Sequence, residues 1–231
     1  MDRRRGSHAA GIAGLVSVGL ELPSALVVIV GGNYPAPDTP AARVTAYLGA
    51  HRTAYLSSLV LEAISLGFFL WFLGGLRQAL EAADDGAWGL ASVAFAGGIA
   101  FTVCTLVEDA ALAALVPVVH SGGSPSTVVA LRWFAFFIEW PFARPLAVVL
   151  LSATSFAGSR TRILPPSIVV LSAVAALANA VFIPSVFVEH GIFVPGGSLA
   201  HLTATLLLEV WVLGASLALL DVRLFPQHRG D

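Results

Sequence analysis

Long apolar stretches recur along the whole chain, and each is long enough to cross a lipid bilayer. A spanning helix needs about 20 mostly apolar residues, and Pro, Gly and charged residues occupy the gaps between the stretches. The sequence therefore predicts an all-α, polytopic membrane protein, a single domain over residues 1–231 that forms a bundle of six transmembrane helices. The predicted spans are residues 9–31, 53–76, 90–118, 127–156, 165–188 and 199–222.

Composition agrees with this prediction and excludes several classes of protein. Charged residues make up only 11% of the 231 residues, whereas a soluble domain carries roughly 25%. Lysine is absent, which excludes a Schiff base to retinal or pyridoxal phosphate. Cys104 is the only cysteine, which excludes disulfides and cysteine-rich metal sites. Because the arginines are scattered, we expect no nucleic-acid partner, and we expect no cofactor.

The arginines outside the spans set an orientation. With the amino terminus inside, eight of them fall on the cytoplasmic side and only Arg43 and Arg52 on the other. Because positively charged loops stay inside, both termini are predicted to be cytoplasmic. The first span follows basic residues without a signal-peptidase site, so we expect it to be retained. Residues 40–52, ahead of the second span, are compatible with a short interfacial helix.

Strongly polar side chains recur at one depth in the predicted spans. At about 1.5 Å per residue they lie roughly 14 to 18 Å below the outer surface, near the centre of a hydrocarbon core of about 30 Å. A lipid-facing carboxylate at this depth costs several kcal/mol, so we expect most of the acids to face a shared interior. Hydroxyl side chains lie on the same helix faces, and ordinary packing between membrane helices is an alternative explanation for them. The layer consists of Glu21, Glu62, Glu108, Asp109, Glu139, Asn179 and Glu209.

The acids of this layer outnumber the bases inside the spans. Six carboxyls face only Arg132 and Arg144, which leaves four carboxyls without an arginine. Burial and like charge both favour a neutral carboxyl. We therefore expect either that several acids are protonated at neutral pH or that the interior holds water or a cation. We also expect Arg132 and Arg144 to pair with Glu139 or with an acid of a neighbouring helix.

The fourth span combines charges, aromatic rings and prolines in RWFAFFIEWPFARP, residues 132–145. Pro141 and Pro145 each remove a backbone donor and clash with the preceding turn, so this span is predicted to be kinked or locally unwound near Arg144. Aromatic rings on helices more often pack against neighbouring helices than bind a ligand. In this segment, with its glutamate, arginine and broken helix, packing and ligand binding are both open interpretations. The residues expected to contact a ligand are Glu21, Arg132, Trp133, Phe136, Phe137, Trp140, Arg144, Asn179 and Thr205.

Four histidines form a weaker signal near the outer ends of the predicted spans. They are His51, His120, His190 and His201, and Glu189 lies beside His190. Imidazole and carboxylate groups can bind a transition metal, but the chain contains no HxxxH or HExxH spacing. We therefore predict no metal site.

Several segments resemble one bacterial membrane family. They are AAGIAGLVSVGLELPSAL, YLGAHRTAYLSSLVLEAISLGFFLWFLGGLRQ, ARPLAVVLLSATSFAGSRTRILPPSIVVLSAVAAL and LTATLLLEVWVLGASLALL. In hydropathy rhythm and short loops, over nearly the whole chain, the sequence is similar to the family catalogued as domain of unknown function 4386. The resemblance implies six helices and a bacterial plasma membrane, but no activity and no catalytic residues.

The first functional hypothesis is an intramembrane enzyme that acts on a lipophilic small molecule. A neutral carboxylic acid in a dry cavity is a strong general acid, and aromatic rings stabilise cations. Isoprenoid cyclisation is the most concrete form of this chemistry, and in kind it is similar to that of small integral-membrane terpene cyclases. Their Trp-Glu pair is present here only reversed, as Glu139-Trp140. The expected catalytic acids are Glu62, Glu108, Asp109, Glu139 and Glu209.

Two other hypotheses come from different classes of protein. Acids at the membrane midplane and a broken helix also fit a proton- or cation-coupled transporter. A transporter of 231 residues is small, so we expect it to form a homodimer. The third hypothesis is a non-catalytic membrane protein such as a sensor, a partner subunit or an immunity factor.

Overall fold

A computed structural model shows that the chain is built from helices. The structure describes residues 3–30, 35, 38–83, 89–188, 191, 194 and 201–221. Within these ranges it contains no β-strand, which confirms the predicted all-α class.

Seven α-helices are described, and shorter helical segments connect some of them. The α-helices are α1 (Arg3–Val30), α2 (Ala41–Ala83), α3 (Leu90–His120), α4 (Pro125–Phe137), α5 (Arg144–Thr161), α6 (Pro166–Ala180) and α8 (Leu206–Leu220). The segments are the π-helices η1 (Ile138–Ala143) and η3 (His201–Thr205) and the 3-10 helix η2 (Ile183–Phe187). Because η1 continues α4 directly into α5, residues 125–161 form one helical rod.

Five helical stretches are long and apolar enough to cross a membrane, so the chain is a multi-pass membrane protein. They are Ala41–Ala83, Leu90–His120, Pro125–Thr161, Pro166–Phe187 and Thr203–Leu220. These stretches correspond to predicted spans two to six. The described part of α1 is a long helix but is not among the five, so the sixth crossing stays a prediction.

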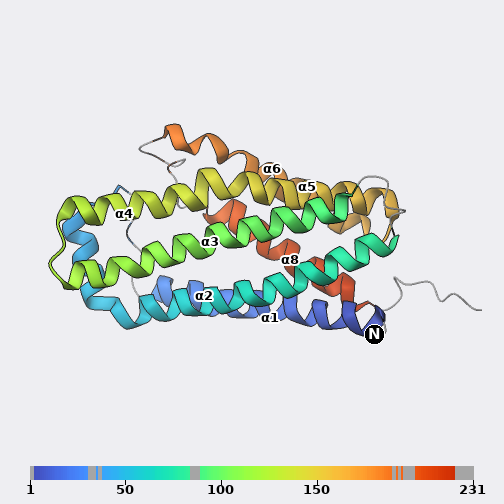
Figure 1. Ribbon diagram of the computed structural model, residues 1–231, viewed down its shortest axis with the longest axis horizontal. Coiled ribbons are helices and arrows are strands. Elements are labelled where there is room, and N and C mark those ends of the chain that lie inside the picture. Colours follow the sequence, from blue (N-terminus) through green and yellow to red (C-terminus); the bar gives the residue numbers. More distant parts are fainter. Residues whose placement is uncertain are drawn as a thin grey trace, which may run out of the picture.

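The helices form a closed ring that follows the order of the chain (Figure 1). α1 packs on α2, α2 on α3, α3 on the α4–α5 rod, α5 on α6, and α6 on α8, which returns to α1. The first turns of α1 lie beside the end of α8, since a Cβ atom at Gly11 would lie 2.7 Å from the Cγ atom of Leu220. Both ends of the described chain therefore lie at one end of the bundle, whereas the side of the membrane they face stays a prediction.

α2 bends at His51, whose backbone leaves the helical region (φ −120°, ψ 19°). The turns before this bend lie across the left end of the bundle in Figure 1, and the rest of α2 runs along α1. The short helix that the sequence suggested ahead of span two is thus present, joined to the span without a loop.

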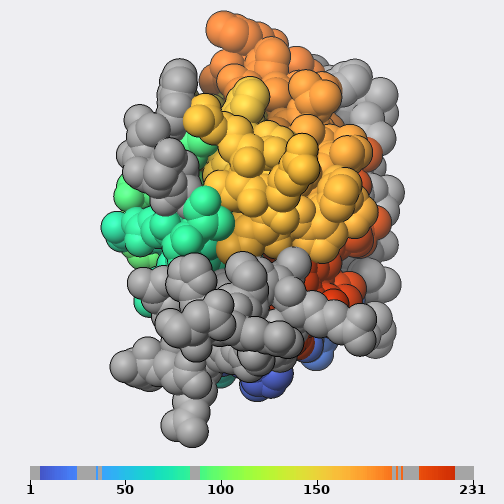
Figure 2. Space-filling view, turned by 90° about the vertical axis from the view of Figure 1, so that its right-hand side faces the viewer, coloured from blue at the N-terminus to red at the C-terminus, as the bar shows by residue number. Residues whose placement is uncertain are grey.

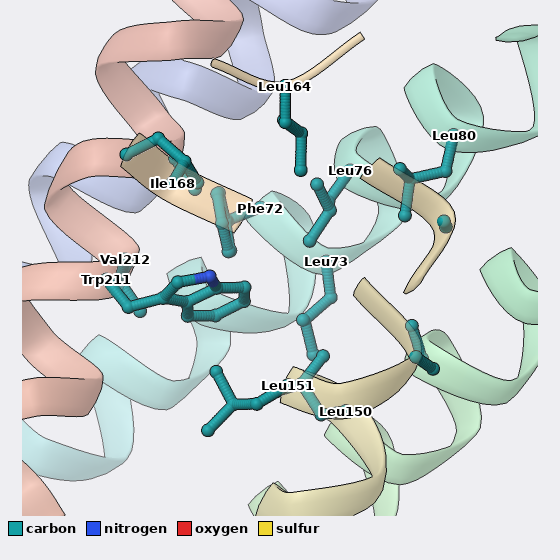
Figure 3. Close-up of a cluster of buried hydrophobic side chains, with 14 of the residues drawn as sticks. Phe72, Leu73, Leu76, Leu80, Leu150, Leu151, Leu164, Ile168, Trp211 and Val212 are labelled. Atoms are coloured by element: carbon teal, nitrogen blue, oxygen red, sulfur yellow. The ribbon is translucent and has the colours of Figure 1, made fainter. Parts of the chain in front are cut away.

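A large apolar cluster fills the half of the bundle nearer the start of α1. Phe72 and Trp211 meet edge to face within it, with ring centroids 5.8 Å apart (Figure 3). The indole Nε1 of Trp211 donates to the Oγ of Ser172 at 2.7 Å, so its polar atom is satisfied. Seen from this end, the residues around the α5–α6 connection form a continuous surface between α3 and α8 (Figure 2). Apolar side chains therefore fill this half of the interior.

Small residues allow α1 to approach its neighbours closely, as is typical of membrane helices. A Cβ atom at Gly75 of α2 would lie 2.0 Å from the Cβ atom of Ala10 in α1. A Cβ atom at Gly14 of α1 would lie 2.0 Å from the Oγ atom of Ser216 in α8. These glycines set the distance between α1 and the rest of the ring.

Substitution of Gly75 tests this packing, because the adjacent Gly74 is a matched control. Both alanine variants gain about 1 kcal/mol in helix propensity, but a Cβ atom at Gly74 meets nothing within 4 Å. We expect Gly75→Ala to destabilise the fold by about 1–3 kcal/mol through overpacking and Gly74→Ala to be neutral or stabilising. Thermal unfolding in detergent measures the difference, and equal melting temperatures for the two variants would contradict the close α1–α2 contact.

Candidate functional site

Four carboxyl side chains from four different elements line one cavity inside the ring. They are Glu21 of α1, Glu62 of α2, Glu139 of η1 and Glu209 of α8, and the cavity has a volume of about 50 Å³. This volume holds a few water molecules or a small ion. The structure thus brings together four of the acids that the sequence placed in one layer. The other lining residues are Ser17, Ser65, Leu66, Phe69, Phe101, Thr105, Arg144, Thr205, Leu208 and Val212.

The π-helix η1 brings Glu139 and Arg144 onto one face. In an α-helix, two residues five positions apart point in directions that differ by roughly 140°. In a π-helix the backbone bonds join residues five positions apart, so these residues lie one above the other. Pro141 lies inside η1, and Pro145 follows in the first turn of α5. The break predicted in span four is therefore present, as a widened helix rather than as unwound chain.

Arg144 is the internal counter-charge of the cavity. Only 1% of its surface is exposed, and its guanidinium forms a salt bridge with the Glu139 carboxylate. The same guanidinium donates to the Oδ1 of Asn179 at 3.1 Å and lies over the Trp140 ring, 4.0 Å from its centroid. Thr105 adds a hydrogen bond at 3.1 Å from its Oγ1 to the Oε2 of Glu139. The pairing predicted for Arg144 is confirmed, and Glu139 is the acid that it neutralises.

The other lining acids have no such partner. Within the described residues, neither Glu62 nor Glu209 accepts a hydrogen bond or forms an ion pair. Glu62 instead experiences the charges of Asp109, Glu21, Glu139 and Glu209. The cavity therefore carries more acidic groups than Arg144 can neutralise.

Glu108 and Asp109 lie on α3 beside this cavity without lining it. They are 8% and 6% exposed. Asp109 follows Thr105 by one helical turn, on the same face of α3, and it interacts electrostatically with Glu139 and Glu21. Its Oδ2 atom is buried without a hydrogen-bond partner. The structure thus places both acids at the edge of the cluster.

Arg132 lies away from the cavity, and its predicted pairing with an acid stays a prediction. Its guanidinium donates to the backbone carbonyl of Thr39 at 2.9 Å and to that of Pro35 at 3.0 Å. These bonds fasten the segment between α1 and α2 to α4. We therefore interpret Arg132 as an anchor for this connection, and its predicted contact with a ligand stays a prediction.

The aromatic rings of span four also lie outside the cavity lining. Trp133 and Phe137 stack on each other with centroids 5.3 Å apart, while Phe136 and Trp140 pack in a small cluster with Phe182 and Ala204. Of the predicted ligand contacts, Glu21, Arg144 and Thr205 line the cavity directly, and Asn179 reaches it through Arg144.

The aromatic residues that do line the cavity are Phe69 and Phe101, which the sequence did not single out. Each shares a helix face with a polar residue of the cavity, since Phe69 follows Ser65 by four positions and Phe101 precedes Thr105 by four. The spacing of four residues from polar residues of the cavity could therefore have identified both rings from the sequence.

The outer histidines do not form a metal site within the described residues, where no cluster of three potential ligands occurs. The ring of His51 stacks on Tyr47, and its Nδ1 bonds the backbone carbonyl of Tyr47 at 3.1 Å. His120 is exposed, whereas His190 and the side chain of His201 lie outside the described part of the chain.

No family model, curated protein or solved structure matches this chain. The resemblance to the family of domain of unknown function 4386 stays a prediction.

Removing one partner of the buried ion pair should destabilise the fold. Arg144→Met leaves the Glu139 carboxylate buried beside Thr105 without its counter-charge, and breaking a buried pair costs about 3–5 kcal/mol. The matched control is Arg77→Met, which breaks an exposed pair with Glu81 (2.7 Å) that contributes about 0.2–1 kcal/mol. Thermal unfolding in detergent measures both variants.

The double variant Arg144→Met with Glu139→Gln completes this test. It removes the uncompensated charge, so we expect it to recover much of the stability lost in Arg144→Met. A double variant as unstable as the single one would contradict a structural role for the ion pair.

Proposed function

We propose that the protein is a proton- or cation-coupled membrane transporter and that the acid-lined cavity is its coupling site. One observation carries this proposal: Glu21, Glu62 and Glu209 share a small interior cavity with the already paired Glu139 and Arg144. Ionisable groups inside membrane bundles mark proton relays and ion pathways.

The charge balance of the cavity requires a mobile positive charge. Two like charges 4 Å apart repel by about 4 kcal/mol at an effective dielectric constant of about 20. Arg144 offsets one of the four lining carboxyls, and Glu108 and Asp109 add two more acids at the edge. The cluster is therefore neutralised by protons or by a small cation, and both can exchange during transport.

The size of the cavity favours protons or a small cation over a bulky ligand, although no three of the described acids converge closely enough to hold a metal ion directly. Its volume of about 50 Å³ is far below the roughly 300–1,000 Å³ of pockets for drug-sized molecules. Carboxylate and hydroxyl oxygens are the ligands that hard cations prefer. Hydroxyls of Ser17, Ser65 and Thr205 lie among the lining residues.

Apolar packing lies on either side of the cavity along the bundle. The cluster around Phe72 and Trp211 fills one half of the interior. A second cluster, which includes Tyr55, Leu59 and Leu112, packs α2 against α3 in the other half. A site with an apolar layer on either side fits alternating access, in which one layer opens at a time.

Acid-initiated chemistry on a lipophilic substrate, with isoprenoid cyclisation as its concrete form, is the second candidate function. The observation that favours it is the pair of rings, Phe69 and Phe101, on the cavity wall, because aromatic faces stabilise cationic intermediates. The cavity would have to enlarge to admit an isoprenoid, so transport is the better supported function. We also propose that the protein crosses a bacterial plasma membrane six times and forms a homodimer.

Proton flux in proteoliposomes tests the proposed function. With an internal pH-sensitive dye, the wild type should acidify or alkalinise the vesicles when a gradient of Na⁺ or K⁺ is imposed. Glu62→Gln and Glu209→Gln should each reduce this flux at least tenfold, because each removes one exchangeable site from the cavity. The control is Glu81→Gln, an exposed acid outside the cavity, which should transport at the wild-type rate.

The same variants separate the alternatives. New cyclic products from isoprenoid epoxides supplied to cells, lost in Glu62→Gln, would favour the enzyme. A folded wild type with neither ion-dependent flux nor products would refute both functions and leave a non-catalytic sensor or partner protein.

A further inference from the structure

We propose that Asp109 is the residue that holds the coupling proton of the cluster, an inference that rests on the proposed transport function. The ligand of this site is a proton, which Asp109 exchanges with Glu62 through the water of the cavity. Glu139, in contrast, is held by Arg144 and serves to position the site.

The first observation is the buried, unsatisfied oxygen of Asp109. Among the described residues, Asp109 Oδ2 is the one carboxyl oxygen that is fully buried and has no hydrogen-bond partner. The whole residue is 6% exposed. A buried acceptor without a donor loses about 1–3 kcal/mol, and more when it is charged. A proton on Asp109 removes that charge.

The second observation is the set of charges that surround Asp109. Glu21 of α1, Glu62 of α2 and Glu139 of η1 each interact with it electrostatically, and Glu108 precedes it on α3. Glu209 of α8 acts on Glu62. Arg144, the arginine that lines the cavity, forms its salt bridge with Glu139. An ionised Asp109 would therefore lie among acids with no cation of its own.

Its position distinguishes Asp109 from the acids of the cavity wall. Glu62 and Glu209 line the cavity, where water can solvate their carboxylates. Asp109 lies one turn along α3 from Thr105, which lines the cavity and donates to Glu139. Asp109 is thus adjacent to the cavity but outside its lining, so a proton held on Asp109 can pass to an acid of the cavity wall.

The transfer is a simple proton exchange. The O–H bond of the Asp109 carboxylic acid breaks, the proton passes through cavity water to a carboxylate oxygen of Glu62, and Asp109 becomes a carboxylate. No oxidant, reductant or leaving group is involved. Only one of the two groups is charged before and after the transfer, so the exchange creates no like-charge repulsion between them.

Infrared spectroscopy with isotope-labelled aspartate tests this assignment. The sequence contains seven aspartates, and only Asp109 and Asp221 fall inside predicted spans, Asp221 at the very end of the last one. Of the others that the structure describes, Asp38 and Asp221 are exposed. A carboxylic-acid C=O band of the full-length protein at neutral pH should therefore shift on carbon-13 labelling of aspartate, and should be absent in Asp109→Asn. Labelling of glutamate should leave the band in place.

The outcomes are distinct. A neutral-acid band that moves only with labelled glutamate, or no such band at neutral pH, overturns the assignment to Asp109. In proteoliposomes, Asp109→Asn should lose at least tenfold in proton-coupled flux, Asp109→Glu should recover part of it, and Glu81→Gln should match the wild type. Flux that persists in Asp109→Asn overturns the inference alone, whereas a wild type without flux overturns the proposed function.

Discussion

The constraint on which this structure depends is that a carboxylate in a hydrocarbon core has to face protein or water. Glu21, Glu62, Glu139 and Glu209 come from four different elements and meet in one cavity, because each would cost several kcal/mol against lipid. The closed ring of helices provides the interior that they need. Small residues such as Gly14 and Gly75 draw α1 into the ring and so bring Glu21 to the cavity.

A local irregularity of the backbone provides the one fixed counter-charge. The π-helix η1 aligns Glu139 with Arg144, five residues later, and Trp140 covers the guanidinium. Trp140 also packs against Phe182 and Ala204, the latter inside the second π-helix, η3. Two irregular segments thus contact each other next to the acids. π-helices are often found at functional sites, and here one of them creates the ion pair between Glu139 and Arg144.

The sequence was informative wherever the physics is local or one-dimensional. Apolar runs predicted spans two to six, because length and hydropathy decide membrane insertion residue by residue. The common depth of the acids predicted their meeting, because depth follows from helical rise alone. The two prolines predicted a break in span four near Arg144. The direction of each side chain around its helix was less accessible, so the sequence did not show that Trp133 and Phe137 stack on each other and lie outside the cavity lining.

The sequence by itself therefore determined the class of protein, the positions of the helices and the excess of acids over arginines in the membrane. Only the tertiary structure decided which acids share the cavity, that Arg144 neutralises Glu139, that Arg132 holds the α1–α2 connection, and that Asp109 lies buried at the edge. The physical reason is that pairing depends on distances between helices. Those distances arise from the packing of small and apolar residues over the whole ring, which no single segment encodes.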